Sequence, residues 1–433
     1  MKLWQKDSTV TSDQIQQFTV GKDKEFDVLL AKYDVQGSLA HTAMLEKVGL
    51  LPTEEYNAIK KELEAIHADI EAGRFVMRDD VEDIHSQIEE MLTEKLGDAG
   101  KKIHSGRSRN DQVAVDLKLY LRAQVKDVKD AVVSLFDLLQ KLSEEHKDKL
   151  LPGYTHLQLA MPSSFGLWFG CYAEGLVDDM GLLAAAYDMA NKNPLGSGAG
   201  YGSSFPLDRA LTTELLGFQS MHYNSVYAQM SRGKTERFVA VALGSIAATL
   251  SRMSMDVCLY MNQNFGFISF PDELTTGSSI MPHKKNPDVF ELIRAKCNRI
   301  QATPNELILL ANNLPSGYHR DMQLTKEILF PAIEDIKACL GMAVLMLGNI
   351  KVKDGLLDDE RYKYLFTVEQ VNDLVNKGVP FRDAYKQVGN DVANGTFAYS
   401  GTLQHTHEGS IGNLCTAEIK VEMGEVLKRF GIV

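Results

Sequence analysis

Long stretches without proline constrain the fold of this chain more than any other feature of its sequence. Its 12 prolines leave four such stretches, at residues 53–151, 163–193, 207–270 and 332–379. Proline interrupts a regular helix, because it removes a backbone hydrogen bond and its ring clashes with the preceding turn. Its absence over so many residues permits long helices, provided that apolar residues recur with the helical period.

The apolar residues of these stretches do recur every three or four positions. Three series show it: Leu117, Leu121, Val125, Val128, Val132, Leu135, Leu139 and Leu142; Leu176, Met180, Leu183, Tyr187 and Ala190; and Val239, Leu243, Ile246, Leu250, Met253, Val257 and Tyr260. Each forms the narrow stripe with which helices pack side by side in a bundle. A helix from about Arg232 to Gln263 would be roughly 45 Å long and would need a partner along its length. The small residues near its stripe favour a bundle shared between subunits, with a long helix inside one monomer as the alternative.

Shorter helical patterns flank the long ones. They occupy residues 26–48, 53–72 and 80–96, and short helices are expected again after residue 351. Strand signals are few, and the Gly/Ser-rich segment 191–206 is expected to be a loop. We therefore expect an all-α chain with an N-terminal helical domain (1–104), a central long-helix bundle domain (105–351) and a small C-terminal helical domain (352–433).

Charge and cysteine content limit the partners and the compartment. The net charge is −12, and no run of Lys and Arg exceeds two residues, which argues against nucleic acid and against an anionic membrane surface as partners. The five cysteines are scattered without metal-ligand spacing, the first residues lack the apolar run of a signal peptide, and no apolar stretch long enough to span a membrane is expected. We expect a soluble cytoplasmic protein that acts on a small-molecule substrate.

A polar loop is expected at residues 277–288. Pro282 and Pro287 exclude a regular helix across it, and the segment carries hydroxyls, a lysine and an amide. A helix is expected to follow, with Asn286 as its N-cap and Glu291 in its first turn. A polar loop that leads into a helix N-terminus can stabilise developing negative charge, although such loops are more often plain surface connections.

Two further polar stretches flank the first long helix. In residues 104–112, Arg109 and Asn110 could bind a carboxylate at a helix entrance, since guanidinium groups bind carboxylates through two hydrogen bonds. In residues 152–158, His156 could act as an acid or base near neutral pH. The alternatives are a solvated basic segment and a structural histidine, respectively.

The last polar stretch is residues 314–326. If this segment is helical, Tyr318, Gln323 and Lys326 spread over one broad side of the helix and could line a pocket for an amino acid. On its own, this spacing is weak support for a binding site.

Together the polar stretches resemble those of the argininosuccinate lyase family, within the fumarase/aspartase superfamily. Residues 277–287 match the superfamily pattern Gly-Ser-Ser-x-Met-Pro-x-Lys-x-Asn-Pro, and residues 82–86, 104–112 and 153–156 resemble motifs of the family itself. The resemblance extends from about Asp34 to Lys326. It implies an all-helical homotetramer with a central bundle of long helices, active sites built from three subunits, no metal or organic cofactor, and cleavage of argininosuccinate to arginine and fumarate.

The resemblance also implies roles for individual residues. It makes Ser278 the general base, His156 an acid or orienting group with Glu291 as its carboxylate partner, and Lys284 a catalytic cation near the succinyl group. The implied substrate-binding residues are Arg109, Asn110, Thr155, Ser279, Met281, Asn286, Tyr318, Gln323 and Lys326. Removing a proton beside a carboxylate creates a dianion, so preorganised donors such as Lys284 could each contribute ~3–4 kcal/mol.

Three segments depart from the family pattern. Asp23 stands where a serine that contacts the substrate is expected, and Gly200-Tyr201 replaces a Leu-Ala pair. Residues 233–238 replace the usual Ser-Asp-Arg-Asp-Phe, so that a family arginine is lost or moved to Arg237. These changes bear on recognition of the arginine side of the substrate rather than on the elimination.

Two other functions remain open from the sequence. One is a different fumarate-releasing enzyme such as adenylosuccinate lyase, which His283 slightly favours. The other is a structural protein, because lens crystallins are relatives of the family. The presence of Ser278, His156 and Lys284 together argues against a purely structural chain.

Overall fold

The computed structural model describes residues 13–78 and 80–431, so the N-terminal residues considered for a signal peptide lie outside it. The chain falls into two compact units. Unit 1 comprises Met1–Val128, Leu182–Ser245 and Arg299–Ile336, and unit 2 comprises Lys129–Gly181, Ile246–Asn298 and Lys337–Val433. The expected three-domain boundaries at residues 104 and 351 stay a prediction.

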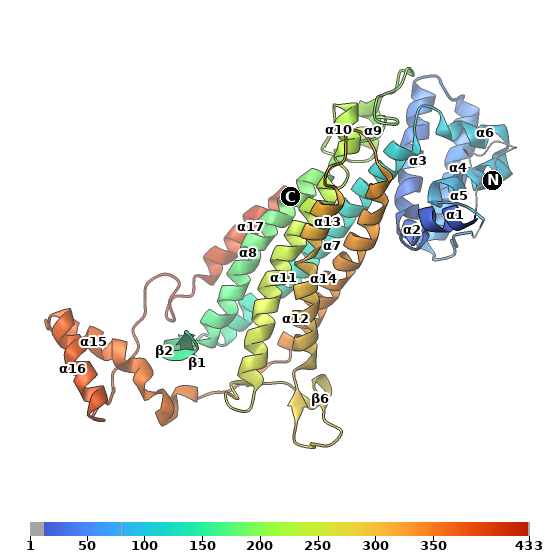
Figure 1. The fold of residues 1–433 in the computed structure, drawn as a ribbon. Helices are drawn as coiled ribbons and strands as arrows, with labels where there is room; N and C mark the ends of the chain where they lie inside the picture. Colours follow the sequence, from blue (N-terminus) through green and yellow to red (C-terminus); the bar gives the residue numbers. More distant parts are fainter. Residues whose placement is uncertain (1–12, 79, 432–433) are drawn as a thin grey trace. The chain divides into compact units, whose positions relative to one another are not determined.

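Four long helices confirm the expectation of a mainly helical fold (Figure 1). They are α7 (Arg109–Glu145), α8 (Phe165–Ala190), α11 (Lys234–Met261) and α14 (Thr325–Leu347). The predicted helix from Arg232 to Gln263 differs from α11 by two residues at each end. The expectation that proline interrupts a helix is wrong for α14, which contains Pro331 in its interior.

Unit 1 holds the shorter N-terminal helices. They are α1 (Asp13–Val20), α2 (Asp23–Asp27), η1 (Val28–Leu30), α3 (Ala31–Lys47), α4 (Thr53–Glu71), α5 (Ile84–Leu96), α6 (Asp98–Lys101) and η2 (Lys102–His104). Helices α3, α4 and α5 pack around one apolar core that contains Val35, Ile59, Leu63 and Ile84. Asp83 caps α5 by accepting a hydrogen bond from the backbone N–H of Ser86 at 2.8 Å, as expected of an Asp N-cap.

The remaining elements of unit 1 are short. They are α9 (Arg209–Leu215), α10 (Ser225–Met230), α13 (Thr303–Leu310), η4 (Arg320–Leu324) and the parallel strands β3 (Lys192–Asn193) and β4 (Ser220–Met221). The segment 191–206 was expected to be a loop. Residues 194–206 are one, but the expectation was wrong at Lys192–Asn193, which form β3.

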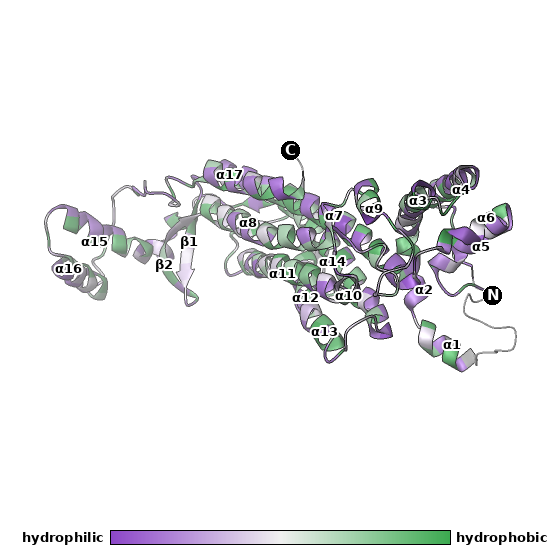
Figure 2. Ribbon diagram, turned by 90° about the horizontal axis from the view of Figure 1, so that it is seen from above, coloured by the Kyte–Doolittle hydropathy of each residue, from purple (hydrophilic) through white to green (hydrophobic). Residues whose placement is uncertain are grey.

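Unit 2 contains three antiparallel strand pairs that the sequence did not predict. They are β1 (Leu150–Thr155) with β2 (Gln158–Ser164), β5 (Ile268–Ser269) with β8 (Lys351–Val352), and β6 (Thr276–Gly277) with β7 (Lys285–Asn286). Its other elements are η3 (Asp272–Leu274), α12 (Asp288–Ile300), η5 (Leu356–Asp358), η6 (Glu360–Phe366), α15 (Thr367–Asn376), α16 (Phe381–Ala393), α17 (Thr416–Leu427) and η7 (Lys428–Phe430). Hydrophobic and hydrophilic residues alternate along α16 (Figure 2), which packs its apolar residues with those of α15.

One segment corrects the expectation that no stretch could span a membrane. The 37 residues Ser225–Met261, which include α11, contain an apolar window with a mean hydropathy of 1.5. By length and composition alone, this helix could cross a membrane. That window is 56% buried within the protein, and the stripe residues Leu243, Ile246 and Leu250 are wholly buried. Because the core helix of a soluble protein has these same properties, α11 is best described as a core helix.

Two glycines of α8 provide a test of the packing in unit 2. A Cβ atom at Gly166 would lie 2.7 Å from Cα of Lys147 and 2.9 Å from the backbone oxygen of Ser143, whereas a Cβ atom at Gly181 would meet nothing within 4 Å. We expect Gly166→Ala to destabilise the protein by about 1–3 kcal/mol through overpacking. Gly181→Ala should stabilise it by about 0.5–1 kcal/mol, because alanine favours the helix. Thermal unfolding of both variants measures the difference, and equal melting temperatures would contradict this packing.

Candidate active site

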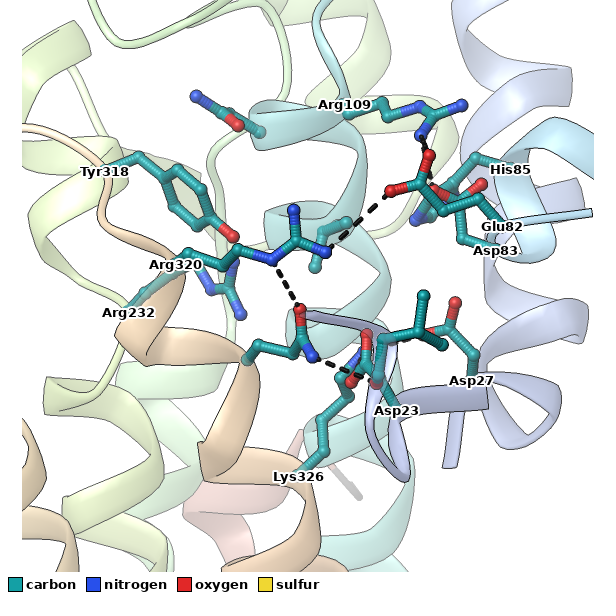
Figure 3. A pocket seen from close by; sticks show the side chains of 14 residues that line it. Asp23, Asp27, Glu82, Asp83, His85, Arg109, Arg232, Tyr318, Arg320 and Lys326 are labelled. Carbon is teal, nitrogen blue, oxygen red and sulfur yellow. Dashed lines mark hydrogen bonds and ion pairs between the residues drawn. The ribbon is translucent and has the colours of Figure 1, made fainter. Parts of the chain in front are cut away.

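Unit 1 contains a polar cavity of about 270 Å³ that gathers five of the predicted substrate-binding residues (Figure 3). Those five are Arg109, Asn110, Tyr318, Gln323 and Lys326. Acidic and basic side chains both line the cavity, so it suits a ligand that carries charges of both signs. In the view of Figure 3, Tyr318 and Arg232 lie on the left side of the cavity, and Glu82, Asp83 and His85 lie on the right. Asp23 and Lys326 lie below them.

The segment 318–326 reaches the cavity without forming one continuous helix. Tyr318 lies in an irregular segment just after Gly317, whose φ of +103° suits glycine. The 3₁₀ helix η4 then begins at Arg320, and Lys326 stands in the first turn of α14. The expected helical spacing was therefore wrong, although its three residues do line one cavity.

Lys326 is the most enclosed cation of the cavity, with 3% of its surface exposed. Its ammonium nitrogen lies 2.7 Å from Oδ1 of Asp23 and 2.6 Å from Oδ1 of Asp27. Burial alone would lower the pKa of Lys326, but the charges of Asp27 and Asp23 outweigh it and raise that pKa. Lys326 therefore stays charged and fixed in position across the neutral range.

A second ionic group lies at the entrance of α7. Nη1 of Arg109 lies 2.6 Å from Oδ2 of Asp83 and 3.6 Å from Oε2 of Glu82. Burial opposes ionisation of Asp83, but the nearby charges of His85 and Arg109 lower its pKa. The chain's own carboxylates thus engage the guanidinium of Arg109, and its predicted contact with a substrate carboxylate stays a prediction.

Gln323 is also engaged by the chain itself. Its amide nitrogen donates to the backbone oxygens of Thr19 at 3.0 Å and Val20 at 3.2 Å, while its oxygen accepts from Nε of Arg320 at 3.2 Å. These bonds hold the end of α1 against η4. A substrate contact through the amide nitrogen of Gln323 would replace one of its two bonds, because that nitrogen has only two hydrogens to donate.

Arg232 is a cavity residue that the sequence reasoning missed. It is 7% exposed, its Nη2 donates to the backbone oxygen of Met322 at 3.2 Å, and its guanidinium lies 5.3 Å from the ring centre of Tyr318. Its buried Nε has no hydrogen-bond partner among the described residues. Arg237, the alternative that the altered segment suggested, does not line the cavity. The signal that could have found Arg232 is its place next to Ser231 and Gly233, just before the long helix.

His85 forms the wall of the cavity together with a buried acidic cluster. Its Nδ1 lies 2.8 Å from Oδ1 of Asp34 and 3.5 Å from Oδ2 of Asp116, and Gln112 donates to Asp34 at 2.6 Å. By residue type, the histidine and the two aspartates could ligate a metal ion. Burial would lower the pKa of His85, but Asp34, Asp83 and Asp116 together raise it to about 9. Burial opposes ionisation of Asp34, but the protonated His85 lowers the pKa of Asp34. Burial and the charge of Asp34 raise the pKa of Asp116 well above its usual range. A protonated imidazolium paired with Asp34 therefore accounts for the centre of the cluster.

In unit 2, Thr155 and His156 stand at the tip of the β1–β2 hairpin. His156 and Leu157 have φ angles of 55° and 58°, which places both in the left-handed region that non-glycine residues rarely adopt. Two such residues form the tight turn that matches the twist of a hairpin. The side chain of His156 is exposed and, in the described chain, makes no hydrogen bond or ion pair with Glu291.

The polar loop that follows β6 is a second exposed hairpin of unit 2. Oγ of Ser278 accepts hydrogen bonds from the backbone N–H groups of Ile280 at 3.3 Å and Met281 at 3.1 Å. The loop also presents Ser279 and Lys284 to solvent, and Lys284 makes no ion pair among the described residues. These contacts preorganise the turn while leaving its functional groups accessible.

The start of the helix after this loop differs slightly from the expectation. Helix α12 begins at Asp288 with Glu291 in its first turn, but Asn286 belongs to β7 and its side chain donates to the backbone oxygen of Gly277 at 3.5 Å. Pro287 supplies the first helical carbonyl, which accepts from the backbone N–H of Glu291. Asn286 thus closes the hairpin and does not cap the helix.

Comparison with known proteins decides the family. A family model described as "Lyase" matches residues 8–302. "Argininosuccinate lyase" of Phocaeicola vulgatus is 60% identical over 99% of this chain and 96% of its own length, and that of Thermotoga neapolitana is 40% identical over 89% and 97%. The chain belongs to the argininosuccinate lyase family. The resemblance of its polar motifs to this family, and through it to the fumarase/aspartase superfamily, is therefore confirmed.

Solved structures support the fold of this argininosuccinate lyase family member. A crystal structure of EDDS lyase in complex with formate superposes with a TM-score of 0.73, at 21% identity over 98% of this chain and 91% of the other. A class II fumarase from Schistosoma mansoni gives 0.70, at 16% identity over 94% and 90%. At these identities the similarity concerns the fold alone.

The buried imidazolium of His85 should make stability depend on pH. Its folded pKa of about 9 lies above the unfolded value of 6.5, so its contribution is fully present below pH 6.5 and is lost as the pH rises through about 9. Between pH 6.5 and about 9, we expect the free energy of unfolding to fall in both the wild type and His85→Gln. The decrease in the wild type should be larger by on the order of 3 kcal/mol. Chemical denaturation at a series of pH values measures both slopes.

The matched control for this experiment is His67→Asn. It removes a half-buried histidine of α4 that lies outside the acidic cluster, and it should keep the wild-type slope. Parallel pH profiles for the wild type and His85→Gln would show that His85 is not a buried cation.

Proposed function

We propose that this protein is an enzyme that cleaves argininosuccinate to arginine and fumarate by β-elimination, in the biosynthesis of arginine. The observation that carries this proposal is the 60% identity to a relative of that name over nearly the whole of both chains. The cavity of unit 1 supports it, because Tyr318, Gln323 and Lys326 line a polar space with charges of both signs. An amino acid carries the same two charges.

The proposed chemistry begins at the loop of unit 2. Ser278, as an alkoxide, would remove the proton beside a carboxylate of the succinyl group. The resulting dianion needs positive charge and N–H donors, which Lys284 and the loop backbone would supply as Asn286 orients the succinyl group. Serine is a weak base at its ordinary acidity, so the surroundings must stabilise its alkoxide strongly and exclude water.

His156 completes the elimination on the leaving-group side. A histidine can donate a proton near neutral pH, here to the departing guanidino nitrogen, with Glu291 as its orienting carboxylate. Thr155, Ser279 and Met281 would contact the substrate beside it, while Arg109 and Asn110 would bind it from unit 1. This chemistry uses acid, base and charge stabilisation and requires no cofactor.

Assembly of the site is proposed to require a cytoplasmic homotetramer whose active sites draw on three subunits. On α11, the large apolar residues Phe238, Val241 and Met255 are 37%, 44% and 43% exposed in the single chain. Exposed apolar side chains along a long helix suit burial against another copy of the bundle. The exposed hairpins that carry His156 and Ser278 suit contact with neighbouring subunits.

Fumarate absorbance with two substrates tests the proposed activity. Argininosuccinate should yield fumarate, whereas adenylosuccinate should not. Fumarate release from adenylosuccinate alone would replace the proposal with the other lyase activity. Release from neither substrate would favour a structural protein of the crystallin type.

Mixing two inactive variants tests the shared site. We expect Ser278→Ala and His156→Asn each to assemble normally and to lose nearly all turnover, because each lacks one proton-transferring group. If the two residues of one site come from different subunits, random reassembly of an equal mixture restores intact sites to at most about one quarter of the total. Turnover after dissociation and reassembly of the mixture provides the measurement. An inactive mixture would mean that both residues come from one subunit, and wild-type turnover by Ser278→Ala alone would remove Ser278 from the mechanism.

A further inference from the structure

We infer that Asp23 binds the α-ammonium group of the substrate's amino-acid end and makes the cavity of unit 1 selective for an α-amino acid. This inference rests on the proposed function and assigns a specificity-determining residue to it. The family resemblance leads us to expect a serine at this position, and the chain carries a carboxylate there.

The first argument is the excess of negative charge around Lys326. One ammonium group meets two carboxylates, those of Asp23 at 2.7 Å and Asp27 at 2.6 Å. The cluster therefore carries a net charge of −1 when all three groups are ionised. Burial raises the pKa of Asp23, Lys326 lowers it and the charge of Asp27 raises it, with a net increase, so Lys326 does not fully compensate this carboxylate. A bound cation supplies the missing charge.

The second argument separates the two carboxylates. Asp27 is 2% exposed, and its other oxygen accepts from the backbone N–H of Ile84 at 3.3 Å, which ties it to the start of α5. The side chain of Asp23 is 21% exposed, and it also lines the cavity. Asp27 thus holds Lys326 in place, and Asp23 is the carboxylate that can exchange its partner for a ligand.

The third argument is the cationic group that faces the same cavity. Arg232 is nine-tenths buried, lines the cavity and has a buried Nε without a partner among the described residues. Arg320 and the ring of Tyr318 lie on the same side in Figure 3. A ligand carboxylate can accept hydrogen bonds from the guanidinium of Arg232, and a ligand ammonium group can donate to Asp23. The α-carbon of an amino acid carries these two charged groups.

The fourth argument concerns the difference between a carboxylate and a hydroxyl. A serine hydroxyl both donates and accepts, so it contacts an ammonium group, a carboxylate or a water equally well. An ionised aspartate only accepts, so it favours a cationic donor and repels a carboxylate. Asp23 therefore fixes which substituent of the α-carbon lies beside Lys326.

Calorimetric binding of three ligands to the intact protein tests the inference without any turnover. The probes are arginine, agmatine (which lacks the α-carboxylate) and deamino-arginine (which has hydrogen in place of the α-ammonium group). The variants are Asp23→Asn and Asp23→Ser, which remove the charge. Glu25→Gln is the matched control, since it removes an exposed charge from the same short helix outside the cavity.

The wild type should bind arginine at least about tenfold more tightly than deamino-arginine, as expected for a charge-assisted hydrogen bond. Asp23→Asn and Asp23→Ser should reduce that ratio by about tenfold, mainly by weakening arginine and agmatine, and Glu25→Gln should keep it. An unchanged ratio in both Asp23 variants, or no binding of arginine by the wild type, would overturn the inference. If argininosuccinate yields no fumarate but the ratio changes as expected, the proposed function fails while the ammonium site stands.

Discussion

Pairing of buried charge is the constraint on which the arrangement of unit 1 depends. An ammonium or carboxylate without a partner in a protein interior costs several kcal/mol, so each such group must meet its partner when the chain folds. Lys326 and Asp27 are 299 positions apart in the sequence and 2.6 Å apart in space. The cluster of Asp34, His85 and Gln112 similarly links α3, α5 and α7. The contacts that form the walls of the cavity are therefore the same ones that hold the helices of unit 1 together.

Much of the helical fold could be predicted because one local rule governs it. A helix has a fixed period, so the spacing of Leu243, Ile246 and Leu250 indicates both the helix and its buried side. Two predictions failed where this local rule does not decide the structure. Pro331 lies inside α14 because packing along a long helix outweighs one lost hydrogen bond. The β1–β2 hairpin escaped prediction because its turn, His156-Leu157, lacks the Asn or Gly that usually marks such a turn.

The candidate site was predictable to the extent that its chemistry lies in compact motifs. Tyr318, Gln323 and Lys326 line one cavity, although the helix assumed for them is an irregular segment, a 3₁₀ helix and the start of α14. Arg232 escaped notice because its contacts are with η4 and the ring of Tyr318, neither of which lies beside it in the sequence. For Asp23, the sequence showed an unusual residue, and only the fold shows that it shares Lys326 with Asp27.

The departures from the family pattern and the reactive groups lie in different parts of the chain. Asp23, one of these departures, lines a cavity whose charged side chains are held by ion pairs, whereas Ser278 and Lys284 stand on an exposed hairpin. A rigid cavity can discriminate between ligands because its unpaired groups cannot relax around the wrong one. An exposed hairpin can close over a substrate and exclude water only after a ligand or a neighbouring subunit covers it. Recognition can therefore change through a single side chain such as Asp23, since that change leaves the groups that would move protons untouched.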